Sequence, residues 1–103
     1  MNIISSIFGK TETINHKQLV GEGALIVDVR SPDEFKSGHI KNSINIPLDL
    51  IAAETAALKK RNKPIITCCR SGARSGMAVS ILKSAGLTAH NGGPWDDLEQ
   101  KIK

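Results

Sequence analysis

The sequence predicts an α/β domain built on a small parallel β-sheet with helices on both faces. Two nearly continuous apolar runs, at residues 24–29 and 65–69, have the composition of strands that are buried on both sides. Residues 73–85 follow the second run and carry apolar side chains at helical spacing. Strands that alternate with helices are joined by right-handed crossovers, and the resulting sheet is parallel.

Apolar runs and turn residues place the individual elements along the chain. In chain order we expect strands at residues 11–14, 24–29, 43–46, 65–69 and 87–90, and helices at residues 16–20, 32–37, 50–58, 73–85 and 95–103. Gly, Pro and Asn lie between these segments, as is typical of turns. No internal repeat or linker interrupts the pattern.

Several helix boundaries carry specific signals. Asn15 is an expected N-cap for the first helix. Ser31 and Glu34 form a capping box, and Pro32 occupies the first helical position that proline favours. Residues 91–94 read Asn-Gly-Gly-Pro, which predicts a tight turn before the last helix.

The stretch that points to chemistry is the junction between the strand at 65–69 and the helix at 73–85. Cys69 ends the strand and is followed by a polar turn that contains glycine. A thiol in this position faces the unpaired N–H groups and partial positive charge of the helix start, and Arg70 and Arg74 add formal charge. Such surroundings lower the pKa of a thiol, and the thiolate is the reactive form.

Asp28 lies at the C-terminal end of the strand at 24–29 and therefore at the same edge of the sheet as Cys69. Ligand sites of parallel sheets lie beyond this edge. We expect structural roles for Asp28 and Arg30, because a buried charge needs a partner. Glu34 is the candidate partner of Arg30.

Length and composition limit the classes of function. The chain has 103 residues, of which 40% are hydrophobic and 23% charged, so we expect one small globular domain at residues 11–103. Residues 1–10 are expected to form an N-terminal extension with a short amphipathic turn. They lack the features of a signal peptide, and no segment has the length of a membrane span, so cytoplasm is the default location.

The composition and the two cysteines also argue against nucleic-acid-binding, disulfide-rich and zinc-binding proteins, and the net charge is +4. Aromatic residues make up only 3% of the chain, which argues against nucleic-acid binding, whereas a mildly positive field suits a small anionic substrate. Adjacent cysteines lack the spacing of a disulfide framework or a zinc site. We therefore expect two reduced thiols and no metal.

Motifs along most of the chain resemble those of the rhodanese (sulfurtransferase) family, in the same order. Residues 69–75, Cys-Arg-Ser-Gly-Ala-Arg-Ser, are similar to the family's active-site loop. The remaining motifs are Asp-Val-Arg at 28–30, Glu-Phe at 34–35, Gly-His-Ile at 38–40, Ser-Ile-Asn-Ile-Pro at 43–47, and Gly-Gly followed by Trp at 92–95. Ser43 stands where family members typically have alanine. The resemblance implies a rhodanese-like fold.

The resemblance also implies a two-step sulfur transfer with Cys69 as the catalytic residue. Its thiolate takes the sulfane sulfur of a donor such as thiosulfate, and an acceptor then removes the sulfur from the Cys69 persulfide. The acceptor would be cyanide, a small thiol or a protein thiol such as thioredoxin. The implied substrate-binding residues are Arg70, Ser71, Gly72, Ala73 and Arg74. No cofactor is implied, and the oligomeric state is left open.

Two alternatives stay open at this point. Counted from Cys68, the spacing to Arg74 is Cys-x5-Arg followed by serine, which is the pattern of cysteine phosphatases and of some arsenate reductases. Counted from Cys69, the spacing is one residue shorter, and a tighter loop suits a single sulfur atom better than a phosphate. A carrier module that stores persulfide and turns over slowly is the other alternative.

Overall fold

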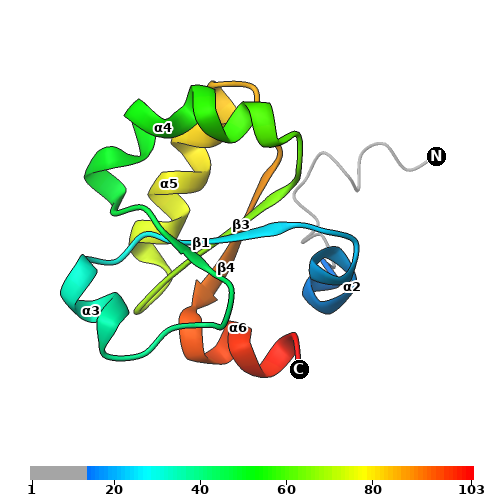
Figure 1. Cartoon of the computed structure of the whole chain (residues 1–103), viewed down its shortest axis with the longest axis vertical. Coiled ribbons are helices and arrows are strands. Elements are labelled where there is room, and N and C mark those ends of the chain that lie inside the picture. The colour runs from blue at the N-terminus through cyan, green and yellow to red at the C-terminus, as the bar shows by residue number, and fades with distance from the viewer. Residues whose placement is uncertain (1–13) are drawn as a thin grey trace, which may run out of the picture.

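The computed structural model of the chain describes residues 14–103, which form a four-stranded sheet flanked by helices (Figure 1). The strands are β1 (Leu25–Asp28), β2 (Ile44–Asn45), β3 (Ile65–Cys69) and β4 (Ala89–Pro94). All of them run parallel in the spatial order β2-β1-β3-β4. The predicted α/β architecture is therefore confirmed. The turn expected in residues 1–10 and residues 11–13 of the first expected strand lie outside the described residues.

Residues 14–103 contain five helices, four of which cover the two faces of the sheet. They are α2 (His16–Gly21), α3 (Pro32–Lys36), α4 (Leu48–Arg61), α5 (Ala73–Ser84) and α6 (Trp95–Lys101). Apolar side chains of α4 and α5 pack on one face, and those of α2 and α6 pack on the other. Figure 1 shows α4 and α5 on the side of the sheet opposite to α2 and α6. In the described part of the chain, no helix has the length and hydrophobicity needed to span a membrane.

The predicted helix boundaries follow from local hydrogen bonds. The side chain of Asn15 accepts from the N–H of Gln18 at the start of α2. Ser31 and Glu34 form the reciprocal capping box at the start of α3. Gly86 adopts a φ of +89° just after α5, a conformation that glycine reaches without steric cost.

Neighbouring residues of β3 belong to different cores. The five residues of the strand are all buried, and successive side chains point to opposite faces. Cys69 packs in the core beneath α4 and α5, whereas Cys68 packs with Leu98 of α6 in the other core. The two adjacent thiols are thus separated by the sheet itself.

The last strand corrects one prediction. We expected a strand at residues 87–90 and a turn at residues 91–94, but β4 extends through these four residues to Pro94. Gly92 explains the difference, because it is packed against β3. A Cβ on Gly92 would lie 2.7 Å from the carbonyl oxygen of Thr67 and 2.8 Å from Cγ2 of Ile66. Gly92 thus permits the close approach of β4 to β3, and its neighbour Asn91 is paired with Thr67 in the sheet.

Candidate active site

Cys69 lies at the bottom of the loop that joins β3 to α5. Its side chain is fully buried, and the loop residues Arg70 and Ser71 above it are exposed. The chain turns into α5 at Gly72, whose φ is +99°. A residue with a side chain would be strained at that angle, so the glycine allows the loop to fold back over the sulfur.

Hydrogen-bond donors surround the sulfur atom of Cys69. The N–H of Gly72 donates to Sγ over 3.0 Å, and the N–H of Ser75 donates over 3.4 Å. The hydroxyl oxygen of Ser75 lies 3.3 Å from the same sulfur. Ser75 is held in place by Thr67, whose hydroxyl donates to the Ser75 carbonyl over 2.9 Å. The first turn of α5 and the loop together form a cradle around one sulfur.

The cradle lowers the pKa of the Cys69 thiol below its usual value. Burial alone would raise this pKa, because it disfavours the charged form. Hydrogen bonds from the Ser75 hydroxyl, and from the backbone N–H groups of Ser75, Gly72 and Ser71, more than offset the burial. A thiolate at Cys69 is stabilised as the sequence predicts, although mainly by hydrogen bonds rather than by arginine charge.

Cys68 has the opposite electrostatic surroundings. Burial and the nearby carboxylate of Asp28 raise the pKa of the Cys68 thiol to about 12. Asp28 is its register partner on the neighbouring strand β1. A thiol with this pKa is neutral throughout the physiological range, so Cys68 is a packing residue in the core that contains Leu98.

Asp28 and Arg30 form a buried ion pair with each other. Nη2 of Arg30 lies 2.7 Å from Oδ2 of Asp28, and Nε contacts both carboxylate oxygens. The guanidinium also donates to the Gly38 carbonyl over 2.7 Å and lies 4.8 Å from the ring centroid of Trp95. Glu34, which we expected to pair with Arg30, does not do so. The correct partner is two residues away because the chain bends immediately after β1.

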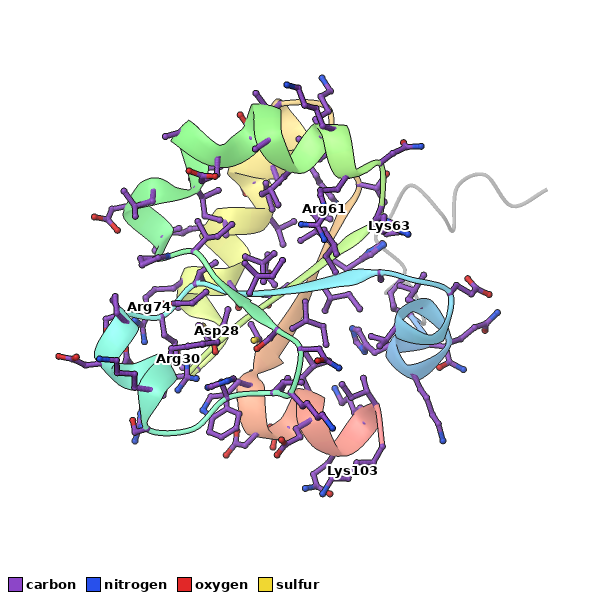
Figure 2. All side chains as sticks on the ribbon, viewed as in Figure 1. Asp28, Arg30, Arg61, Lys63, Arg74 and Lys103 are labelled. Carbon is purple, nitrogen blue, oxygen red and sulfur yellow. The ribbon has the colours of Figure 1, made fainter. Side chains whose placement is uncertain are left out.

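Glu34 pairs instead with Arg74 in the first turn of α5. The two carboxylate oxygens accept from Nη1 and Nη2 of Arg74 over 2.7 and 3.0 Å. This bidentate pair connects α3 to the start of α5, and each side chain is about one-third exposed, at 33% for Glu34 and 35% for Arg74. Figure 2 shows Arg74 grouped with Asp28 and Arg30 at one end of the sheet, far from Arg61 and Lys63.

We expect the Arg74–Glu34 pair to make folding stability depend on acid pH. Hydrogen bonds from Arg74, and then from Ser31, hold the pKa of Glu34 to about 2, well below its usual 4.5. A depressed carboxyl pKa contributes stability above the unfolded-state pKa, and that stability is lost as pH falls towards the folded-state pKa. In urea unfolding between about pH 5 and pH 2, the part of the loss that comes from this pair should be at most ~1 kcal/mol, because both side chains are about one-third exposed.

The variant Glu34→Gln is the matched comparison for this measurement. Glutamine keeps the shape of the side chain but has no charge to titrate. The difference in unfolding free energy between wild type and variant should therefore shrink as pH falls. A difference that stays constant across the range would show that the ion pair contributes nothing to stability.

The structure brings together most of the residues that the sequence singled out. Arg70, Ser71 and Ala73 are exposed around the mouth of the loop, and Gly72 and Arg74 are half-buried beside Cys69. Sequence reasoning gave no role to Ser75 and placed Asn91 in a turn. Asn91 comes from β4 and reaches the loop only in the folded chain, so no spacing in the sequence signals it. Among the described residues, no group of three metal-ligating side chains is present.

The fold and the site define a class of protein. It is the class of α/β domains in which a buried cysteine with a lowered thiol pKa lies between a parallel strand and the start of a helix. Within this class, the chain belongs to the rhodanese family. The family model described as rhodanese-like domain matches residues 13–93.

Named relatives and solved structures agree with the family. The chain is 34% identical over 80 residues to thiosulfate sulfurtransferase PspE of Escherichia coli. The aligned region covers 75% of this chain and 77% of that protein. A putative mitochondrial thiosulfate sulfurtransferase of Schizosaccharomyces pombe is 31% identical over 110 residues, with 93% and 78% covered. A structure titled rhodanese with anions from E. coli superposes with a TM-score of 0.67 at 30% identity, and it covers 73% of this chain and 91% of that one.

In other relatives, the segment that matches this chain is only part of a longer protein. The chain spans 51% of an uncharacterized Bacillus subtilis protein, YqhL, that is 37% identical over 65 residues. It spans 17% of a tRNA sulfurtransferase of Thermoplasma acidophilum, at 28% identity. The rhodanese-like unit is thus found both in short proteins and within larger ones.

Proposed function

We propose that the chain is a sulfurtransferase that carries sulfur as a persulfide on Cys69. The observation that supports this most directly is the hydrogen-bond cradle around Sγ, which stabilises a thiolate at a strand end. Relatives that are named sulfurtransferases also support this proposal. This is covalent catalysis in which the first product leaves before the acceptor reacts.

In the first step, the Cys69 thiolate attacks the sulfane sulfur of a small anionic donor such as thiosulfate. A bond forms between Sγ and that sulfur, the sulfur–sulfur bond of the donor breaks, and sulfite leaves with the bonding electrons. In the second step, an acceptor nucleophile attacks the outer sulfur of the persulfide. The bond to Sγ then breaks and returns the electron pair to Cys69, which is again a thiolate.

The loop suits a persulfide because the N–H groups of Ser71, Gly72 and Ser75 are directed towards Sγ. A persulfide is anionic on its outer sulfur, and preorganised N–H donors stabilise such charge without reorganisation. The exposed Arg70 makes no salt bridge with residues 14–103 and is the cation most accessible to an approaching anion. Arg74 adds positive charge, although Glu34 balances part of it.

The phosphatase or arsenate-reductase alternative requires Cys68 as the nucleophile. The position and protonation of that residue argue against it, because Cys68 is buried beneath the opposite face of the sheet with a thiol pKa of about 12. The Cys-x5-Arg register thus begins at a thiol that the loop does not surround. A persulfide carrier with slow turnover uses the same Cys69 chemistry and differs only in rate and acceptor.

A thiol acceptor, including a thioredoxin-like protein, fits the second step, as does cyanide. Both cysteines are free in the structure. Transfer between thiols needs them reduced, so we propose a reducing compartment such as the cytoplasm.

Intact mass of the purified protein after brief thiosulfate treatment tests the proposal. The expected result is one added sulfur atom, which cyanide removes and peptide mapping locates on Cys69. A protein that gains no sulfur but hydrolyses a phosphate ester or reduces arsenate would contradict the proposal. Rapid sulfur loading with slow release to cyanide, but fast release to a protein thiol, would identify the carrier form.

A further inference from the structure

Asn91 connects three parts of the cradle through its side-chain amide. Nδ2 donates to the carbonyl oxygen of Gly72 over 3.1 Å, and Oδ1 accepts from the N–H of Gly93 over 2.9 Å. Oδ1 also lies 2.7 Å from the hydroxyl oxygen of Ser75. One exposed side chain on β4 therefore contacts the loop, the first turn of α5 and its own strand.

These partners determine which way the amide points. The carbonyl of Gly72 needs a donor, and the N–H of Gly93 needs an acceptor, so the nitrogen and oxygen of the amide cannot exchange places without losing both bonds. Oδ1 is consequently the atom that faces Ser75. An acceptor, rather than a donor, stands beside the hydroxyl group that contacts the nucleophile.

The hydroxyl of Ser75 has one proton and three acceptors around it. The acceptors are Oδ1 of Asn91 at 2.7 Å, the Gly72 carbonyl at 3.1 Å and Sγ of Cys69 at 3.3 Å. A hydroxyl donates one hydrogen bond at a time. When the hydroxyl donates to Asn91, a lone pair of its oxygen faces Sγ and can accept a hydrogen bond from a Cys69 thiol. When the hydroxyl donates to Sγ instead, it stabilises a Cys69 thiolate.

We propose that Asn91 is a positioning residue for the Cys69 nucleophile, because its amide oxygen competes with Sγ for the single proton of the Ser75 hydroxyl. In the thiol state, Cys69 donates to Ser75 and Ser75 donates to Asn91. When the thiol proton leaves to solvent, the Ser75 hydroxyl turns from Oδ1 to the thiolate. Asn91 thus acts through Ser75 and does not itself touch the reacting sulfur.

A glycine inside α5 provides a second observation for this role. Gly76 is a helix-interior residue, where alanine would favour the helix by about 0.5–1 kcal/mol. A Cβ on Gly76 would lie 3.2 Å from Nδ2 of Asn91, which is tighter than ordinary contact. The absence of a side chain at Gly76 leaves the room that the Asn91 amide occupies.

The competition has a chemical consequence for the proposed sulfur transfer, on which this inference rests. A thiolate loses nucleophilicity as its pKa falls, and an attacking thiol is most effective when its pKa is close to the ambient pH. The cradle by itself lowers the pKa of Cys69. An acceptor that withdraws the Ser75 proton limits this decrease and preserves the reactivity of the sulfur.

Other titratable groups near Cys69 have little effect in the relevant pH range. Arg74 of α5 stays cationic, and Cys68 of β3 stays neutral, since its pKa is about 12. Asp28 and Arg30 balance each other. His90 precedes Asn91 on β4 and lies near His16 of α2, on the other face of the sheet.

The test is the pH dependence of Cys69 alkylation by iodoacetamide, carried out on the full chain in a Cys68→Ala background. Asn91→Ala should lower the apparent pKa of Cys69 by about half a unit, a size typical of one hydrogen bond. Asn91→Asp should raise it, because a carboxylate accepts more strongly and adds negative charge. An unchanged pKa in both variants, or a raised pKa in Asn91→Ala, would overturn the proposal.

A double-variant comparison tests the same link from the helix side. Gly76→Ala should lower the pKa of Cys69 in the parent protein but not in the Asn91→Ala protein, because its effect passes through Asn91. If Gly76→Ala changes the pKa of Cys69 equally in both proteins, or changes it in neither, the proposed link through Asn91 is contradicted. Asn45→Ala is the matched control, since Asn45 bridges the carbonyls of Asp28 and Arg30 at the other edge strand and should leave the titration unchanged.

These measurements are independent of whether sulfur is transferred. If wild-type protein forms no persulfide but the titrations shift as expected, the proposed function fails and the role of Asn91 holds. If the persulfide forms and the titrations do not shift, the opposite conclusion follows.

Discussion

Cys69→Ser is expected to abolish sulfur transfer, with a loss of at least about a thousandfold in kcat/KM. The reason is that the hydroxyl has a far higher pKa than a thiol and forms no persulfide, even in a cradle of N–H groups. The variant should fold, because serine is close to cysteine in size and the N–H of Gly72 and of Ser75 can donate to its oxygen. Sulfite release from thiosulfate, measured with cyanide as acceptor, gives the rate.

Cys68→Ala is the matched control for that experiment. It removes the neighbouring thiol without placing a hydroxyl group in an apolar core, and a loss of about 1–2 kcal/mol in stability is expected from the small cavity. Its kcat/KM should stay within a few-fold of wild type. Loss of activity in Cys68→Ala together with full activity in Cys69→Ser would transfer the nucleophile to Cys68 and revive the longer loop register.

Asp28→Ala should cause a larger loss of folding stability than Cys68→Ala or Glu34→Gln. Arg30 is only 5% exposed, and without Asp28 its guanidinium is left buried with no countercharge. Removal of one partner of a buried ion pair typically costs about 3–5 kcal/mol. This is a large fraction of the total stability of a small domain, about 5–15 kcal/mol. Urea unfolding followed by far-ultraviolet circular dichroism measures the change.

Two further variants separate the buried pair from other effects. Glu34→Gln breaks the half-exposed pair with Arg74 and should cost no more than about 1 kcal/mol. The double variant Asp28→Leu/Arg30→Met removes both buried charges and should recover much of the loss, because no uncompensated charge remains. A cost of Asp28→Ala below about 1 kcal/mol would show that the guanidinium reaches water or another partner.

The parts of the fold that could be predicted depend on interactions between close neighbours in the sequence. Ser31 and Glu34 of the capping box are three positions apart, and so are Asn15 and Gln18 of the first cap. The buried strands β1 and β3 are visible in the sequence as nearly continuous apolar runs, which are typical of strands covered on both faces. The position of Cys69 at a strand end and helix start follows from the same local signals.

Two predictions failed where distant segments compete for the same residue. Glu34 lies four residues from Arg30, yet it pairs with Arg74, because Asp28 already satisfies Arg30 and α5 brings Arg74 alongside α3. Residues 91–94 have the composition of a turn, yet they form part of β4, since Gly92 allows the strand to pack closely on β3. Local propensity could not decide either case.

By itself, the sequence determined the order of strands and helices, the edge of the sheet at which the cysteine lies, and the loop that surrounds it. Each of these depends on hydrophobic periodicity or on contacts within one turn, which residue types encode directly. Only the tertiary structure decided that Glu34 pairs with Arg74 and that Asn91 stands beside Ser75. Those contacts join residues 16 to 40 positions apart, and they depend on how the strands are ordered and registered in the sheet.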